Sequence, residues 1–225
     1  LRQNGDDVVR LVRPQTSADG SSVGWDPTTR SIDRAKLEGF DAVVHLAGEN
    51  ISARRWSRAQ KERIRSSRID DTLLLCSTLA SLEAPPRTLL SGSALGFYGD
   101  RGSVKLTEEL EPGNDFLGQV TWEWEKATLG ATTVGIRVAN LRFGLVLTAE
   151  GGLLGRMLPM FRLGIGGRLG SGSQYMSWIS RHDAVKAMVH LLETNEVVGP
   201  VNISSPNPMP NAEFTKALAK AVMRP

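Results

Sequence analysis

Short apolar runs rich in β-branched residues alternate along this chain with segments whose apolar residues recur at helical spacing. The runs that predict strands cover residues 8–12, 41–48, 87–91, 134–147 and 201–204. Helical patterns cover residues 52–82, 121–129 and 183–192, with Asp183 as the expected cap of the last, and a closing helix is expected to be capped by Asn211. Because parallel strands need helical crossovers, this alternation predicts an α/β fold with a doubly wound, mostly parallel sheet.

Composition narrows the class of protein. A chain of 225 residues suits one domain, or a core with a small lobe. No uncharged apolar run approaches the length of a membrane span, so no membrane partner is expected. Cys76 is the only cysteine, which excludes an internal disulfide and favours a reducing, cytoplasmic location. The three histidines lack metal-ligand spacing, so no metal is expected.

The positive charge is local, because residues 52–68 hold seven basic side chains and one glutamate. Five of them step by four and three residues and are expected to share one helix face: Arg54, Arg58, Lys61, Arg65 and Arg68. A solvated helix face is the favoured interpretation. A stripe that meets an anionic ligand at one end is the second, and a DNA or RNA surface is disfavoured because no nucleic-acid-binding motif is present.

Glycine dominates residues 151–172, where eight of the 22 residues are glycine. This density predicts a mobile or tightly turning segment rather than a packed core element.

The carboxyl ends of the predicted strands are where a doubly wound sheet binds its ligands. Arg13 ends the first visible strand, Ala47 and Gly48 the second, and Ser91 to Ser93 the third. In a dinucleotide fold, an arginine after the second strand suits a 2′-phosphate, so Arg13 favours NADP over NAD; an ordinary exposed arginine is the alternative.

Several segments together resemble the epimerase branch of the extended short-chain dehydrogenase/reductases. They are residues 45–51, Arg55-Trp56, Ser67-Arg68, residues 91–100 and 141–147, and the run 166–179. Since they follow in order over nearly the whole chain, the resemblance implies a Rossmann core, a nicotinamide dinucleotide, and a small C-terminal substrate lobe. It places the core at residues 1–147 with 182–204, and the lobe at residues 148–181 with 205–225.

The resemblance also implies roles for individual residues. Arg13 matches a phosphate-side arginine, Ser91 belongs to the strand end, and Leu46, Ala47 and Gly48 match a loop along the cofactor. Arg68 matches the arginine of a Ser-Arg pair near the dinucleotide, and Val146 a position at the nicotinamide end. Ser93 occupies the place of the catalytic serine, and Tyr98 is the nearest tyrosine, so these two are the catalytic candidates.

Two segments of the family pattern are not in this sequence. The glycine fingerprint G-x-x-G-x-x-G is absent, residues 1–4 read like the end of a helix, and the last helix stops at Arg224-Pro225. We therefore expect the natural protein to have a strand, a glycine-rich turn and a helix before residue 1, and a further segment after the lobe. Without the glycine-rich turn, this chain alone is expected to bind a dinucleotide poorly.

The usual catalytic pair is also missing. Enzymes of this superfamily use a tyrosine with a lysine four residues later, but Tyr98 is followed at that spacing by Gly102 and Tyr175 by Ile179. By position, an expected helix from Asp115 to Lys126 replaces this motif, with Leu117 and Thr121 near the tyrosine and lysine places. Neither residue supplies a phenol or a cation. A substitute acid or base could come from Tyr98, Glu123 or Asp115, each of which has a structural role as its alternative.

The sequence therefore leaves two hypotheses. One is an NADP(H)-dependent oxidoreductase or nucleoside-diphosphate-sugar epimerase-like enzyme with atypical acid–base residues. The other is a catalytically weak NADP(H)-binding sensor or scaffold. The expected ligand is a small molecule, a nucleotide sugar or a carbonyl compound, and the expected assembly is a homodimer.

Overall fold

A four-stranded parallel sheet forms the centre of the protein in the computed structural model, which describes residues 1–2, 5–13 and 22–224. Its strand order is β10-β6-β5-β4, and the strands are β4 (Ala42–His45), β5 (Thr88–Ala94), β6 (Arg137–Phe143) and β10 (Gly199–Ile203). In register, His45 lies beside Ser91 and Ser91 beside Asn140. The expected turn over residues 1–4 lies partly outside the described residues.

A second, smaller sheet holds the N-terminal strands. β1 (Arg10–Val12) pairs in parallel with β2 (Ser22–Asp26), which pairs antiparallel with β3 (Ser31–Ile32). A 3-10 helix, η2 (Arg34–Leu37), then leads toward β4. The chain thus has the expected α/β architecture with mostly parallel pairing, and two further strand pairs lie near its C-terminal part.

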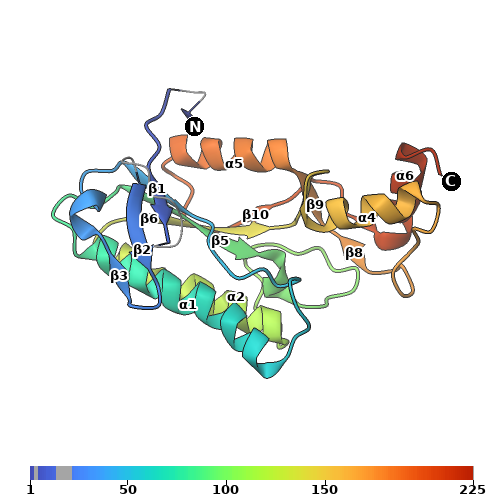
Figure 1. Cartoon of the computed structure of the whole chain (residues 1–225), viewed down its shortest axis with the longest axis horizontal. Helices are drawn as coiled ribbons and strands as arrows, with labels where there is room; N and C mark the ends of the chain where they lie inside the picture. The colour runs from blue at the N-terminus through green and yellow to red at the C-terminus, as the bar shows by residue number, and fades with distance from the viewer. Residues whose placement is uncertain (3–4, 14–21, 225) are drawn as a thin grey trace.

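Helices cover both faces of the central sheet (Figure 1). α1 (Arg58–Ala80), α2 (Phe116–Lys126) and α3 (Leu129–Thr132) lie on one face, where Leu75 and Leu79 of α1 pack with Leu89 of β5. α5 (Arg181–Glu193) lies on the other, where Leu191 packs with Leu90 and Leu141. Strands buried on both faces are why the sequence reads as continuous apolar runs rather than alternating ones.

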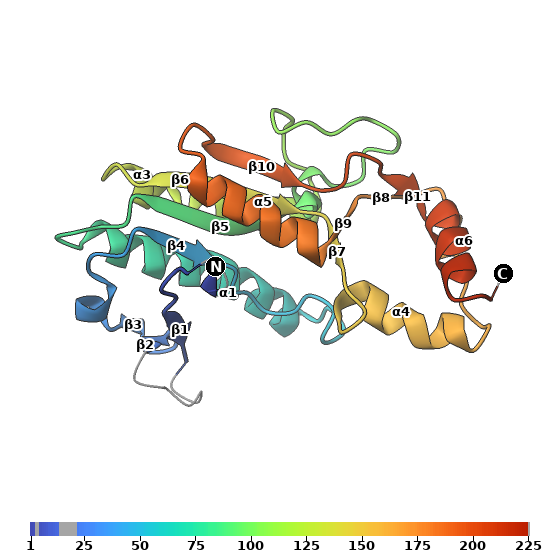
Figure 2. The ribbon, with the colours of Figure 1, turned by 90° about the horizontal axis from the view of Figure 1, so that it is seen from above.

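The C-terminal lobe extends beyond the carboxyl end of the sheet (Figure 2). It contains α4 (Gly152–Arg162), α6 (Asn211–Ala221) and the pair β8 (Tyr175–Met176) with β11 (Met209–Pro210). β7 (Leu145–Leu147) and β9 (Trp178–Ser180) pair in parallel where the lobe meets the core. Phe161, Met176 and Phe214 form the centre of the lobe's own apolar cluster.

The glycine-rich segment is only partly the turning segment that its composition predicts. Gly164, Gly170 and Gly172 have positive φ angles and do turn the chain. Residues 152–162, however, form α4, and Phe161 is buried in the lobe cluster. The expectation of no packed element was wrong there, because α4 carries apolar residues that bury against α6.

Helix starts differ from the sequence expectation because side-chain caps decide them. α1 begins at Arg58, where Ser57 accepts a hydrogen bond from the Gln60 amide at 3.2 Å. Arg54 lies before this cap, so it is not part of the basic helix face. α2 begins at Phe116, where Asp115 accepts from the backbone amide of Gly118 at 2.8 Å. The helix expected from Asp115 to Lys126 is confirmed, whereas the helical pattern at residues 121–129 starts too late.

The two later caps also differ. Ser180 caps α5 by accepting from the Asp183 amide at 3.0 Å, so Asp183 lies in the first turn rather than at the cap. Asn211 is the first residue of α6, and its side chain accepts from the Leu169 amide at 2.8 Å. It therefore ties the glycine-rich segment to α6 instead of capping the helix.

The break that divides the predicted strand 134–147 falls at Gly144, as expected. A Cβ at Gly144 would lie 2.6 Å from the backbone oxygen of Ser177, so only glycine fits between β6 and β9.

Of the helices in the described part of the chain, none is long and apolar enough to cross a membrane.

Candidate functional site

A cavity of about 270 Å³ lies at the carboxyl edge of the central sheet. Strand ends supply five of its lining residues: Leu46, Gly92, Ser93, Phe143 and Val146. Helices α2 and α5 supply the other five: Trp124, Arg181, Ala184, Val185 and Met188. Three of the residues selected from the sequence, distant from one another in the chain, therefore meet at one cavity, because parallel strands end at the same edge.

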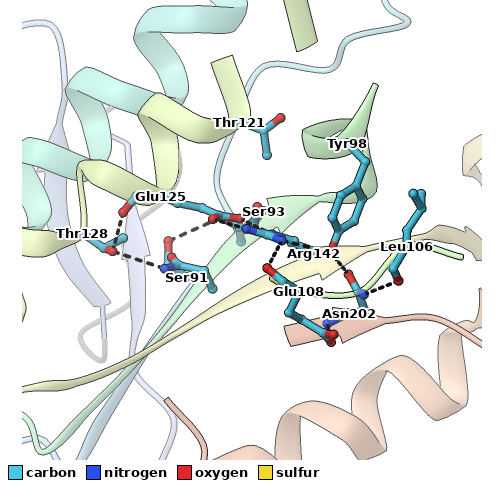
Figure 3. A network of polar contacts seen from close by, with 12 residues as sticks. Ser91, Ser93, Tyr98, Leu106, Glu108, Thr121, Glu125, Thr128, Arg142 and Asn202 are labelled. Carbon is cyan, nitrogen blue, oxygen red and sulfur yellow. Dashed lines mark hydrogen bonds and ion pairs between the residues drawn. The ribbon is translucent and has the colours of Figure 1, made fainter. Parts of the chain in front are cut away.

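A buried polar network begins at the wall of this cavity (Figure 3). The Ser93 hydroxyl donates to Glu125 Oε1 at 2.6 Å. Arg142 donates to the same carboxylate twice, from Nε to Oε1 at 2.8 Å and from Nη2 to Oε2 at 2.9 Å. Ser93 is 4% exposed, and the Arg142 and Glu125 side chains are 3% and 10% exposed. This is a bidentate ion pair with little access to water.

The network continues from Arg142 to the tyrosine. Arg142 Nη1 donates to the Tyr98 hydroxyl at 2.9 Å and to the backbone oxygen of Glu108 at 3.1 Å. The Tyr98 hydroxyl in turn donates to Asn202 Oδ1 at 2.7 Å. Glu108 Oε1 accepts a hydrogen bond from the backbone amide of Asn202 at 2.8 Å, which connects the loop before α2 to β10.

The hydrogen bonds of Arg142 keep its guanidinium charged inside the protein. Burial by itself disfavours the charged form of Arg142, but its hydrogen bonds to Glu125 and Tyr98 outweigh burial, and the pKa of Arg142 is raised. The guanidinium also stacks on Phe97, with its central carbon 3.5 Å from the ring centroid. Arg142 therefore remains a fixed cation at the centre of the network.

Tyr98 lies away from the cavity. It belongs to the 3-10 helix η3 (Leu95–Tyr98), is fully buried, and is not among the residues that line the cavity. Its hydroxyl donates once and accepts once within the network, so its geometry is that of a residue that positions Arg142.

α2 carries the residue that the sequence argument missed. Leu117, Thr121 and Glu125 step by four residues and share one helix face. Thr121 Oγ1 donates to the Leu117 backbone oxygen, and Glu125 reaches Ser93. Glu125 follows Thr121 by four residues, just as Thr121 follows Leu117, so it lies on the same helix face. This spacing could have indicated Glu125 from the sequence.

The other two candidate acids are engaged elsewhere. Asp115 caps α2, and Glu123 pairs with Arg65 of α1 at 2.6 Å on a partly exposed surface. Neither lines the cavity.

Arg68 lies across the loop that follows β4. Its Nη1 donates to the backbone oxygens of Glu49 and Ile64 at 3.0 and 3.2 Å, and its central carbon lies 5.1 Å from the Trp124 ring centroid. Burial lowers the pKa of Arg68, while the charge of Glu49 acts in the opposite direction. A Cβ at Gly48 would lie 3.3 Å from this guanidinium, so the glycine lets Arg68 lie against the loop.

Trp124, which forms one wall of the cavity, is held from behind. Its Nε1 donates to Thr72 Oγ1 at 3.0 Å, and Thr72 Oγ1 contacts His45 Nε2 at 3.0 Å. Burial lowers the pKa of His45 to about 4, so the imidazole is neutral in the folded protein near neutral pH.

Arg13, Ala47 and Ser91 are near the strand ends but do not line the cavity. The Arg13 side chain is 59% exposed and lies 4.0 Å from Asp71 of α1. Burial raises the pKa of Asp71, and the charge of Arg13 partly opposes that effect. Ala47 is half-buried, and Ser91 is fully buried within β5.

A dinucleotide is compatible with part of this site. A Cβ at Gly92 would lie 3.2 Å from Trp124, so a side chain there would press on the cavity wall. Two cations lie near strand ends, since Arg13 follows β1 of the smaller sheet and Arg68 of α1 lies against the loop after β4. Nothing in these 225 residues supplies the glycine-rich turn that binds a pyrophosphate. The described residues therefore offer cations and a cavity near strand ends, without the turn that binds a pyrophosphate.

Two further features complete the surroundings. Arg181 at the cavity wall pairs with Glu150 at 3.2 Å, both side chains being more than half exposed. A separate cavity of about 330 Å³ lies in the lobe between α4 and α6, and none of the predicted site residues lines it. Within the described residues, no group of three or more His, Cys, Asp or Glu side chains is arranged to hold a metal ion.

Comparison with known proteins gives consistent matches. The model of the NAD dependent epimerase/dehydratase family matches residues 1–204. An epimerase family protein of Mycobacterium bovis is 43% identical over 225 residues, which cover this whole chain and 74% of that protein.

Two solved structures also match. Human epimerase family protein SDR39U1 (isoform2), solved with NADPH, is 30% identical with a TM-score of 0.87, over 100% of this chain and 74% of that one. A nucleoside-diphosphate sugar epimerase from Corynebacterium glutamicum is 32% identical with a TM-score of 0.83. That match covers 97% of this chain and 51% of the Corynebacterium chain.

Proposed function

Since this chain belongs to the NAD-dependent epimerase/dehydratase family, we propose that it is an NADP(H)-dependent oxidoreductase or nucleotide-sugar epimerase-like enzyme with atypical acid–base residues. The observation that carries the proposal is the cavity where Leu46, Ser93 and Val146 meet at the carboxyl edge of the sheet. The NADPH in the structure of the human relative supports the choice of cofactor. The division into a core of residues 1–147 with 182–204 and a lobe of residues 148–181 with 205–225 is part of this proposal.

The residues near the strand ends divide the binding of the cofactor among them. Arg13 pairs with the 2′-phosphate, while Leu46, Ala47, Gly48 and Arg68 lie along the dinucleotide. Val146 contacts the nicotinamide end, and Ser91 supports the strand end from within β5. When bound, the nicotinamide supplies hydride chemistry.

The proposal gives Ser93 and Tyr98 different roles. Ser93 lines the cavity and contacts the substrate. Tyr98 is a positioning residue, because its hydroxyl bridges Arg142 and Asn202 inside the protein. The substrate is a small molecule, either a nucleotide sugar or a carbonyl compound, and the assembly is proposed to be a homodimer.

A second candidate function is a catalytically weak NADP(H)-binding sensor or scaffold. The observation that favours it is on α2, which carries Leu117 and Thr121 near the positions where the family resemblance would place the tyrosine and the lysine. Leucine transfers no proton, and the Thr121 hydroxyl is bonded to its own helix backbone.

Two measurements test the proposal on protein expressed from its complete coding sequence. Calorimetric titration with NADPH and NADH is expected to show binding, tighter for NADPH. A panel of nucleotide sugars and carbonyl compounds is then tested by fluorescence for oxidation of NADPH or reduction of NADP⁺, and by NMR for an epimerised product, which forms without net change of the cofactor. Turnover supports the enzyme, tight NADPH binding without any turnover supports the sensor, and absence of binding to both cofactors contradicts both hypotheses.

A further inference from the structure

The Ser93 hydroxyl proton is committed to Glu125. A serine hydroxyl has one proton to donate and lone pairs that accept, whereas a carboxylate only accepts. The 2.6 Å contact between Ser93 Oγ and Glu125 Oε1 therefore has Ser93 as its donor. A charge-assisted hydrogen bond of this length is among the stronger ones in proteins.

The hydrogen bond from Ser93 to Glu125 is hard to break, because Arg142 holds the Glu125 carboxylate in place. Two guanidinium nitrogens of Arg142 bind the two carboxylate oxygens, and the third binds Tyr98 and the Glu108 backbone. Moving Glu125 away from Ser93 would break a buried ion pair and leave Arg142 uncompensated, which is costly at 3% exposure.

Toward a ligand in the cavity, Ser93 Oγ can therefore accept a hydrogen bond but cannot donate one. Apart from Arg181, the other residues that line the cavity are apolar or glycine and accept no strong hydrogen bond from a ligand. The Trp124 N–H already donates a hydrogen bond to Thr72. Arg181 is a donor, and it is paired with Glu150. Ser93 is thus the side chain of this wall that is arranged to accept a hydrogen bond.

We propose that the cavity selects a ligand that presents a hydroxyl group to Ser93, and that Glu125 is the residue that sets this preference. An alcohol donates a hydrogen bond from its hydroxyl group to Ser93 Oγ. A ketone or aldehyde oxygen needs a donor, and Ser93 has no free proton for it. This inference rests on the proposed function for its ligand class, and it reverses the usual expectation that the serine at this place polarises a carbonyl.

The test uses a matched pair of small probes, cyclohexanol and cyclohexanone, which differ in hydrogen-bonding role and hardly in shape. Their binding to the protein loaded with NADP⁺ is measured by ligand-detected NMR. The alcohol is expected to bind about tenfold more tightly, which corresponds to one net hydrogen bond. Equal affinities, undetectable binding of the alcohol, or tighter binding of the ketone would overturn the proposal.

Variants locate the preference. Ser93→Ala is expected to abolish it by weakening alcohol binding alone. The double variant Glu125→Leu/Arg142→Met removes both buried charges together, so that neither is left unpaired. It frees the Ser93 proton, and ketone binding is expected to improve until the preference is lost. Thr121→Val is the matched control, because its hydroxyl is bonded within α2 and should leave the preference unchanged. A preference that persists in the double variant would contradict the role of Glu125.

A direct measurement covers the case in which the double variant does not fold. Neutron diffraction of the unaltered protein is expected to place the Ser93 deuterium on the line to Glu125, and a deuterium directed into the cavity would refute the proposal. NADPH titration of the unaltered protein distinguishes failure of this inference from failure of the proposed function. If the unaltered protein binds NADPH but shows no preference for the alcohol, this inference fails while the proposed function stands. In the variants, NADPH titration shows whether the cofactor site is intact.

Discussion

At the scale of single residues, Arg13 tests the choice of cofactor. Its side chain is 59% exposed, and its ion pair with Asp71 is long, at 4.0 Å, so the guanidinium is accessible to a phosphate. Arg13→Ala is expected to weaken NADPH binding by about 1.5–3 kcal/mol, the scale of a charged hydrogen bond, and NADH binding far less. Calorimetry with both cofactors measures this.

Arg87→Ala is the matched control for that experiment. Arg87 is another exposed arginine that contacts an aspartate, but it lies before β5 at the opposite edge of the sheet. It should change neither affinity. Equal losses for NADPH and NADH in Arg13→Ala would remove the argument for a phosphate contact.

Ser93 and Tyr98 make a second comparison at the residue scale. Ser93→Ala is expected to lower any NADP(H)-dependent turnover of a hydroxyl-bearing substrate by about 10- to 1000-fold, the range for acid–base groups and polar contacts in the transition state. Tyr98→Phe should reduce turnover much less.

The effect of Tyr98→Phe is expected in stability instead. It deprives Asn202 Oδ1 of a donor and Arg142 of an acceptor, which should cost about 1–3 kcal/mol in urea unfolding. If Tyr98→Phe abolishes turnover while Ser93→Ala leaves it intact, the two roles are reversed.

At the scale of elements, α2 positions the site, because it carries both Trp124 and Glu125. Its start depends on the Asp115 carboxylate, which accepts from the Gly118 amide. Asp115→Ala should therefore lower the free energy of unfolding by about 0.5–2 kcal/mol. Asn114→Ala, at the exposed position next to the cap, is the control and should change it little. An unaffected Asp115→Ala variant would show that packing alone sets the start of α2.

At the scale of the whole molecule, the neutral His45 makes stability depend on pH. Its pKa is about 4 in the fold and near 6.5 when unfolded, so the unfolded chain binds a proton that the folded protein excludes. The stability from this group is complete above pH 6.5 and is lost as the pH falls toward 4. The total loss is of order 3 kcal/mol, from one proton over this interval.

Urea unfolding at a series of pH values measures the effect in the unaltered protein and in His45→Leu. The variant should be less stable at neutral pH, since Thr72 loses a partner, but its stability should fall less steeply below pH 6.5. The same slope in both proteins would show that His45 does not titrate as its burial requires.

The sequence alone determined the alternation of strands and helices, the family, and the strand ends at which a ligand would lie. These features are local or depend on order along the chain: apolar runs make buried strands, and parallel strands end at one edge. The resemblance to the family selected Leu46, Ser93 and Val146 along the chain, and the parallel strands bring these three residues together at one cavity.

The tertiary structure decided the partners of those residues. Ser93 and Glu125 are separated by 32 positions, and Tyr98 and Asn202 by 104, so no local pattern indicates either contact. Both form because α2 packs on β5 while β10 lies beside β6, which brings side chains of four elements around Arg142. Away from water such groups must satisfy one another, and only the packing of the whole chain determines which ones meet.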